Sequence, residues 1–143
     1  MKPITDSDLL ALIPQNPPFV MISELVNANE KNCTTKFKIL DENVLCDNGI
    51  LNPSGLIENI AQSCAAHKGY ECMVQNQTVP VGFIGEVRDF TYSKLPKAGD
   101  IITTEITIEN QIFDVTLISG KVFHDKIEIA SCAMKIFVRK EGN

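Results

Sequence analysis

Residues 52–66 read NPSGLIENIAQSCAA, and this composition predicts one long helix. Pro53 suits a first helical turn, because its missing N–H would have no partner there anyway. Asn52 or Ser54 can cap the free amides of that turn. We expect the helix to continue to about Gly69 or the residue after it, because glycine is a common C-terminal stop.

Apolar side chains surround almost the whole circumference of this helix, which indicates a buried helix rather than a surface one. Glu58 and Gln62 are the exceptions, and their separation of four residues places them on one face. A carboxylate on a buried helix is costly unless it is paired, hydrogen-bonded or protonated. Glu58 is therefore either a structural partner of a loop or a lysine, or a group for acid–base chemistry, and the helix alone leaves both interpretations open.

The composition is that of a globular protein of one domain, with 143 residues, 44% of them hydrophobic and 22% charged. A net charge of −5 with scattered basic residues argues against nucleic-acid binding. No apolar run approaches the ~20 residues of a membrane span, and the polar start of the chain does not resemble a signal peptide. Five cysteines without a CxxC pair predict reduced thiols in a cytoplasmic protein. Two histidines, His67 and His124, argue against a conventional zinc site, so we expect no metal.

The remaining pattern predicts mainly strands. We expect a short helix at 7–12, strands at 19–27, 32–39, 79–90, 101–110, 112–123 and 127–139, a polar connector at 71–78, and a hairpin tip at 124–126. Asp47-Asn48-Gly49 indicates a turn, and Gly82 and Gly85 indicate a bulge or a close backbone approach.

One buried helix is covered most economically by a curved antiparallel sheet wrapped around it. This predicts an α+β fold in which residues 1–143 form a single domain. Such a sheet leaves one strand edge bare, and a bare edge invites pairing with another chain. We therefore expect a two-fold homodimer joined edge to edge.

Three segments resemble the hotdog-fold 3-hydroxyacyl-(acyl carrier protein) dehydratases of the FabA and FabZ type. Residues 12–22 (LIPQNPPFVMI) are similar to the family's opening LxPHRxPFLxID, and residues 53–62 to its helix start, PGxLxxEAxAQ. Residues 81–90 (VGFIGEVRDF), followed by Pro96 and Gly99-Asp100, are similar to its third motif, which ends in PGD. The helix segment also resembles a divergent branch associated with aryl-polyene and related pigment pathways. The resemblance covers most of the chain and implies a hotdog fold.

The resemblance implies dehydration of a 3-hydroxyacyl thioester to the 2-enoyl thioester, in fatty-acid or polyketide-like synthesis. In the family a histidine removes the proton next to the thioester carbonyl, and a helix carboxylic acid protonates the departing hydroxyl. Glu58 and Gln62 match the family's helix Glu and Gln. Backbone amides near Gly55 and Leu56 would polarise the carbonyl, and Phe83 and Phe90 are candidate contacts of the acyl chain.

The chain departs from the family at its histidines. Residues 44–51 (VLCDNGIL), which correspond to the family's HFPG region, contain no histidine, and Gln15 replaces the histidine of the opening motif. Cys46 and Asp47 are the nearby groups that could replace the base, although cysteine is more often a small apolar filler and Asp47 a turn residue. His67 follows Glu58 by nine positions, so we expect it on the opposite side of the helix in a structural role. We expect His124 to be solvated.

Three functions remain open at this point. The first is the dehydratase, and the second is an acyl-thioester hydrolase in which Glu58 activates water or attacks the thioester. The third is a non-catalytic acyl-binding subunit that pairs with a competent dehydratase. None of them requires a cofactor, since the substrate arrives on the phosphopantetheine of acyl carrier protein or on coenzyme A. The expected partners are the acyl thioester, acyl carrier protein and a second subunit, with a higher oligomer or a heteromer left open.

Overall fold

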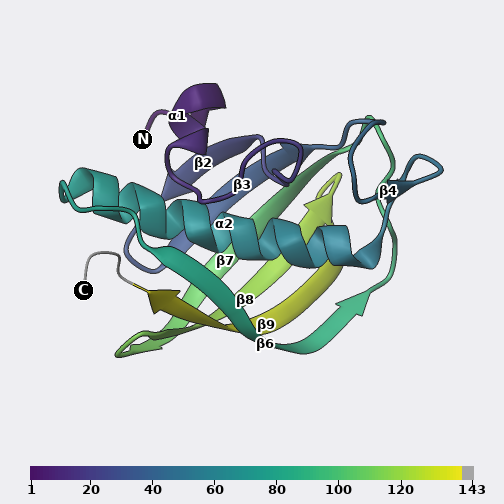
Figure 1. The fold of residues 1–143 in the computed structure, drawn as a ribbon. Helices are drawn as coiled ribbons and strands as arrows, with labels where there is room; N and C mark the ends of the chain where they lie inside the picture. Colours follow the sequence, from purple (N-terminus) through teal and green to yellow (C-terminus); the bar gives the residue numbers. More distant parts are fainter. Residues whose placement is uncertain (140–143) are drawn as a thin grey trace.

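A curved antiparallel sheet forms the body of the protein (Figure 1) in the computed structural model, which describes residues 1–139. Its strands lie in the order β1-β2-β3-β7-β8-β9-β6, and all neighbours are antiparallel. The strands are β1 (Ile4–Thr5), β2 (Glu24–Ala28), β3 (Asn32–Lys38), β6 (Val81–Tyr92), β7 (Ile101–Ile112), β8 (Val115–His124) and β9 (Ile127–Arg139). A separate hairpin pairs β4 (Cys46–Asp47) with β5 (Ile50–Leu51), and a short helix, α1 (Asp6–Leu10), follows β1.

The long helix α2 (Pro53–Val74) lies across one face of the sheet (Figure 1). It starts as expected, since Pro53 occupies its first turn and the side chain of Asn52 accepts a hydrogen bond from the Gly55 amide. The strands β2, β3, β7 and β8 all contact it. The predicted α+β arrangement, an antiparallel sheet wrapped around one long helix, is therefore confirmed.

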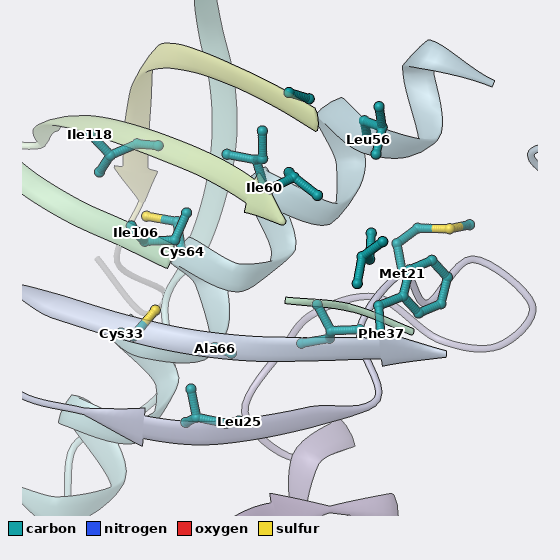
Figure 2. Packing of buried hydrophobic residues seen from close by; sticks show 14 of the residues in the cluster. Met21, Leu25, Cys33, Phe37, Leu56, Ile60, Cys64, Ala66, Ile106 and Ile118 are labelled. Atoms are coloured by element: carbon teal, nitrogen blue, oxygen red, sulfur yellow. The ribbon is translucent and has the colours of Figure 1, made fainter. Parts of the chain in front are cut away.

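The core lies between α2 and the sheet (Figure 2). Leu56 and Ile60 of the helix are fully buried, and Ile60 lies near Ile106 of β7, beside Gly120 of β8 (Figure 2). Gly120 of β8 lets the helix approach, because a Cβ atom there would lie 2.6 Å from Ile60. These contacts fix the distance between α2 and the sheet and the rotation of the helix about its axis. They thereby fix the direction in which Glu58 and Gln62 point.

Helix α2 is longer than the sequence suggested. Gly69 does not end it, and the helix continues to Val74. Residues 71–74, which were expected to belong to a polar connector, are therefore helical. The glycine is required by packing instead, because a Cβ at Gly69 would overlap the carbonyl oxygen of Leu12. The segment after α1 therefore presses its backbone directly against the helix.

Gly69→Ala is expected to lower the free energy of unfolding by about 2–3 kcal/mol, because the added methyl group overpacks against backbone that has little freedom to move. Urea unfolding followed by circular dichroism measures the change. Gly82→Ala is the matched control, because the nearest atom to its added Cβ lies at 3.5 Å, an ordinary contact. Equal stability of the Gly69→Ala variant and the wild type would contradict the close approach.

The residues that connect α1 to β2, numbers 11–23, are here called the α1–β2 loop. The sequence predicted a strand from 19 to 27, but β2 includes only Glu24–Ala28. The backbone groups of Phe19 and Met21 bond to side chains of α2 rather than to a neighbouring strand. Met21 and Ile22 are buried without belonging to the sheet, whereas Phe19 is largely exposed, so the apolar pattern of this segment does not reflect a strand.

The turns follow the sequence more closely. Asn48 and Gly49 both have positive φ, 51° and 76°, in the two-residue turn between β4 and β5. The pairing of β6 with β9 shifts register between Ile84 and Glu86, which confirms the expected bulge at Gly85. A Cβ at Gly85 would overlap the ring of Phe137, so this glycine also accommodates an aromatic side chain.

The outer edge of β6 is unpaired within residues 1–139, since its neighbour in the sheet is β9 alone. Most of its residues are exposed, among them Phe83, Ile84 and Val87. At the other end of the sheet β1 is only two residues long. The exposed backbone of β6 is thus the long free edge of the described structure. No helix within this part of the chain is long and apolar enough to cross a lipid bilayer.

Candidate active site

Glu58 and Gln62 form the polar centre of α2. Gln62 is fully buried, and its side-chain amide donates to Glu58 Oε2 at 3.0 Å. The half-buried Glu58 carboxyl is thus held by a neighbour one turn away, as the spacing predicted. This bond uses one carboxyl oxygen and leaves Oε1 for a ligand.

Gln62 also fastens the α1–β2 loop to the helix. Its Oε1 accepts a hydrogen bond from the Met21 amide at 2.6 Å, and its Nε2 donates to the Phe19 carbonyl at 3.0 Å. Asn59 adds a third bond, from Nδ2 to the Met21 carbonyl at 2.8 Å, while its Oδ1 accepts from the hydroxyl of Thr104. These bonds fix the rotamer of Gln62, and Gln62 in turn fixes the orientation of the Glu58 carboxyl.

A cavity of about 330 Å³ lies beside this carboxyl. Helix α2 contributes Glu58, Ala61, Ala65 and Lys68, a stripe spaced by three or four residues. The alanines leave room for a ligand where larger side chains would fill the space. The opposite wall is apolar and comes from the ends of two strands, namely Phe83 and Ile84 of β6 and Ile136 and Val138 of β9. The cavity is therefore a slot with one apolar wall, which suits a ligand with an apolar chain, and Glu58 is one of three carboxyl side chains on its lining, with Glu30 and Glu71.

The structure brings together only some of the expected site residues. Phe83 lines the cavity with Glu58, whereas Gly55, Leu56, Cys46 and Phe90 are not among its lining residues. The Gly55 amide already donates to Asn52, and Leu56 is fully buried in the core. Phe90 packs against Tyr92, with ring centroids 5.8 Å apart. These residues therefore support the fold around the site.

Cys46 is poorly suited to act as a base. Burial raises the pKa of its thiol, and the nearby carboxylates of Asp41 and Asp47 raise it further. The thiol stays protonated at neutral pH, and its sulfur lies 3.8 Å from the carbonyl oxygen of Leu40. Cys46 lies in β4, in the hairpin that precedes α2, and is not among the residues that line the cavity.

Neither histidine is hydrogen-bonded to Glu58 within residues 1–139. His67 is almost fully buried, and its Nε2 lies 2.6 Å from the Asn29 carbonyl oxygen, a structural contact. It also borders the cavity that contains Glu58, although the two residues are nine positions apart on the helix. The side chain of His124 is only 14% exposed and lies 3.6 Å from Asp100, so it is not freely solvated as expected.

Two contributors were missed by sequence reasoning. Asn59 is an amide side chain next to Glu58 on a helix expected to be buried, and this was the available signal in the sequence. Its hydrogen-bond partners, Met21 and Thr104, are far away in the sequence and could be identified only from the structure. Gln15 enters the cavity from the α1–β2 loop. Within residues 1–139, no group of three or more His, Cys, Asp and Glu side chains is placed to hold a metal ion.

In a comparison with known families, the model of the ApeP-like proteins, described as ApeP dehydratase, matches residues 7–143 of this chain. The chain belongs to the ApeP-like dehydratase family. A comparison with curated proteins found no match. The dehydratase resemblance seen in the motifs of this ApeP-like chain is thus confirmed at the level of the family.

Solved structures support the fold of the ApeP-like chain. It is similar to the dehydratase heterocomplex ApeI:P from Xenorhabdus doucetiae, with a TM-score of 0.86 and 13% identity over 93% of this chain and 91% of that one. A hypothetical thioesterase from Streptococcus pneumoniae matches with a TM-score of 0.63 and 13% identity, over 82% and 90%. The PaaI protein of Escherichia coli, from a phenylacetic acid degradation operon, matches with a TM-score of 0.60 and 11% identity, over 79% and 80%. The fold is therefore the hotdog fold, and family and fold together support a protein that acts on acyl thioesters.

Proposed function

We propose that this ApeP-like chain is a subunit of a 3-hydroxyacyl thioester dehydratase, and that Glu58 is its general acid. In this reaction the C2–H and C3–O bonds of the substrate break, a C2=C3 double bond forms, and water leaves. Glu58 protonates the departing 3-hydroxyl, and Gln62 positions the carboxyl for this transfer. The observation that carries the proposal is the carboxyl oxygen that Gln62 leaves unused, beside a cavity with an apolar wall.

The proton at C2 requires a base, and no unbonded histidine lines the cavity within residues 1–139. The histidine that lines the cavity, His67, is bonded to Asn29, and Gln15 stands where the family's opening motif has its histidine. A second subunit that docks on the free edge of β6 would bring its own side chains to the cavity, because Phe83 and Ile84 belong to both the edge and the cavity wall.

Apolar exposure along β6 supports such docking. Phe83 is 51% exposed, Ile84 39% and Val87 36%, on a strand whose outer backbone groups are unpaired in residues 1–139. The similar ApeI:P structure is a dehydratase heterocomplex by description. We therefore propose a heteromer with a second dehydratase subunit as the active form, and a homodimer as the state of the chain alone.

The same proposal includes the carrier and the compartment. Acyl carrier protein presents the acyl group on its phosphopantetheine arm, which the reaction leaves intact, so no further cofactor is needed. All five cysteines are free, and such thiols persist in the reducing cytoplasm, where fatty-acid or polyketide-like synthesis would take place.

The test is a reaction with a 3-hydroxyacyl thioester on acyl carrier protein, read by mass spectrometry. The chain is assayed alone and after co-purification with a dehydratase subunit from the same pathway. The expected result is loss of one water from the substrate by the pair and little or none by the chain alone. Loss of water by the partner alone at the same rate as by the pair would overturn the catalytic role.

A hydrolase is the second candidate, favoured by the presence of a carboxyl in the cavity without a bonded histidine. Glu58 would then activate water against the thioester carbonyl or attack it directly. Release of a free thiol in the same assay, detected with a thiol-reactive dye, distinguishes this reaction from dehydration. No conversion of several chain lengths, with or without the partner, would leave the acyl-binding role as the explanation of the cavity.

A further inference from the structure

The cavity beside Glu58 extends in one direction along α2. Within residues 1–139, the α2 residues that line it begin at Glu58 and end at Glu71, so no earlier part of the helix contributes. At a rise of about 1.5 Å per residue, the stretch from Glu58 to Lys68 is roughly 15 Å long. A ligand whose reacting carbons lie at Glu58 therefore has room toward the C-terminal end of the helix.

Two alanines keep this stretch open. Ala61 and Ala65 follow Glu58 by three and seven positions, so the three side chains lie on one face of α2. Both alanines are only half-buried, because the face that they form borders the cavity. The wall across from them is apolar and includes Ile136 and Val138 of β9. This part of the cavity suits a hydrocarbon chain that runs along the helix.

The lining turns polar at the far end of this stretch. Lys68 Nζ lies 3.2 Å from Glu71 Oε1, and the two side chains are 31% and 36% exposed. A second cavity of about 660 Å³, which shares Glu30 and Glu71 with the first, is here called the distal cavity. Most of its lining is polar, and Lys31 and Gln75 belong to it. A terminal methyl group gains little from entering such surroundings, because these polar groups would lose contact with water.

We infer that Ala61, Ala65 and the Lys68–Glu71 ion pair set the length of the acyl chain that this site accepts. The inference rests on the proposed acyl-thioester function and adds to it the residues that determine chain-length specificity. An extended hydrocarbon advances about 1.25 Å per carbon–carbon bond, given bond lengths near 1.5 Å. The roughly 15 Å from Glu58 to the ion pair thus hold about 12 bonds beyond the third carbon, which gives a limit of roughly 15 carbons.

A leucine in place of either alanine would block the chain at a defined point. Ala65 lies about 10.5 Å from Glu58 along the helix axis, and Ala61 lies about 4.5 Å from it. Ala65→Leu is therefore expected to lower the limit from roughly 15 to roughly 11 carbons, and Ala61→Leu to roughly 7. Lys68→Met replaces the charged end of the stretch by an apolar one and should raise the limit above that of the wild type.

Binding of acyl-pantetheine amides tests this order without turnover. An amide nitrogen replaces the thioester sulfur, and the saturated chain has no hydroxyl to lose, so neither proposed reaction consumes the probe. Chains of about 4 to about 18 carbons are titrated by isothermal calorimetry into the chain and into its complex with the partner subunit. The affinity of the wild type is expected to rise by up to about fourfold per added methylene and to stop rising at the limit.

Ala11→Leu is the matched control, because it makes the same substitution at an exposed position outside the cavity. It should keep the wild-type limit. Circular dichroism verifies that each variant is folded. Ala65→Leu and Lys68→Met move the limit in opposite directions, which a general disturbance of the fold would not do, so the test stands even if Ala61→Leu does not fold.

The outcomes separate this inference from the proposed function. One limit shared by the wild type and all variants overturns the role of these residues and leaves acyl binding intact. An equal loss of affinity at every length, or a shorter limit in Ala65→Leu than in Ala61→Leu, overturns the direction of the chain and with it the inference. Binding of no probe by the wild type, alone or in the complex, contradicts the acyl-thioester function itself. Limits that lengthen from Ala61→Leu through Ala65→Leu and the wild type to Lys68→Met support the assignment.

Discussion

Glu58→Gln is expected to lower the rate of water loss from a 3-hydroxyacyl thioester by about 10²–10⁴, the usual contribution of a general acid. The substitution keeps the size of the side chain and its bond to Gln62 but removes the transferable proton. Folding should be little affected, because the carboxyl is only half-buried. Mass spectrometry of the carrier-bound product measures the rate, and circular dichroism verifies the fold.

The control is Glu105→Gln on β7, a carboxylate at an exposed position away from the cavity. It should react at the rate of the wild type. A Glu58→Gln variant that retains more than about a third of the wild-type rate would assign the acid to another group, since a general acid typically contributes about 10²–10⁴.

Gln62→Met is expected to lower the free energy of unfolding by about 3 kcal/mol. The side chain is fully buried, and its loss leaves the Met21 amide and the Phe19 carbonyl without their partners. Each unpaired buried group costs about 1–3 kcal/mol, and the similar volume of methionine keeps the cavity term small. Urea unfolding measures the change. Turnover should fall as well, because Glu58 loses the donor that orients its carboxyl.

Gln77→Met provides the control, as the same substitution at an exposed position, and should unfold at the wild-type midpoint. A stability loss below about 1 kcal/mol in Gln62→Met would show that the α1–β2 loop finds other hydrogen-bond partners. The loop would then not depend on this side chain.

The sequence was most informative where a local pattern determines the structure. The start of α2 at Pro53, the Asn48–Gly49 turn and the bulge at Gly85 each follow from the conformational preferences of one or two residues. The spacing of Glu58 and Gln62 likewise predicted that their side chains would meet, since residues four apart share a helix face.

The rest depends on contacts between distant parts of the chain. Gly69 looked like a helix stop, because nothing local reveals that Leu12 lies against it. Residues 19–23 looked like a strand, because an apolar segment packed on a helix has the same composition as a buried strand. The bonds from Gln62 to Phe19 and Met21 span 43 and 41 residues, a separation at which no spacing rule applies.

The hydrogen bonds of Gln62 also impose an order on synthesis. The α1–β2 loop leaves the ribosome first, yet its hydrogen-bond partner Gln62 belongs to a helix that is synthesised some forty residues later. Domains settle only after their segments have emerged. The apolar residues of the nascent α1–β2 loop therefore stay exposed to solvent until α2 has formed. The Glu58 carboxyl reaches its final orientation only after the loop has bonded to Gln62.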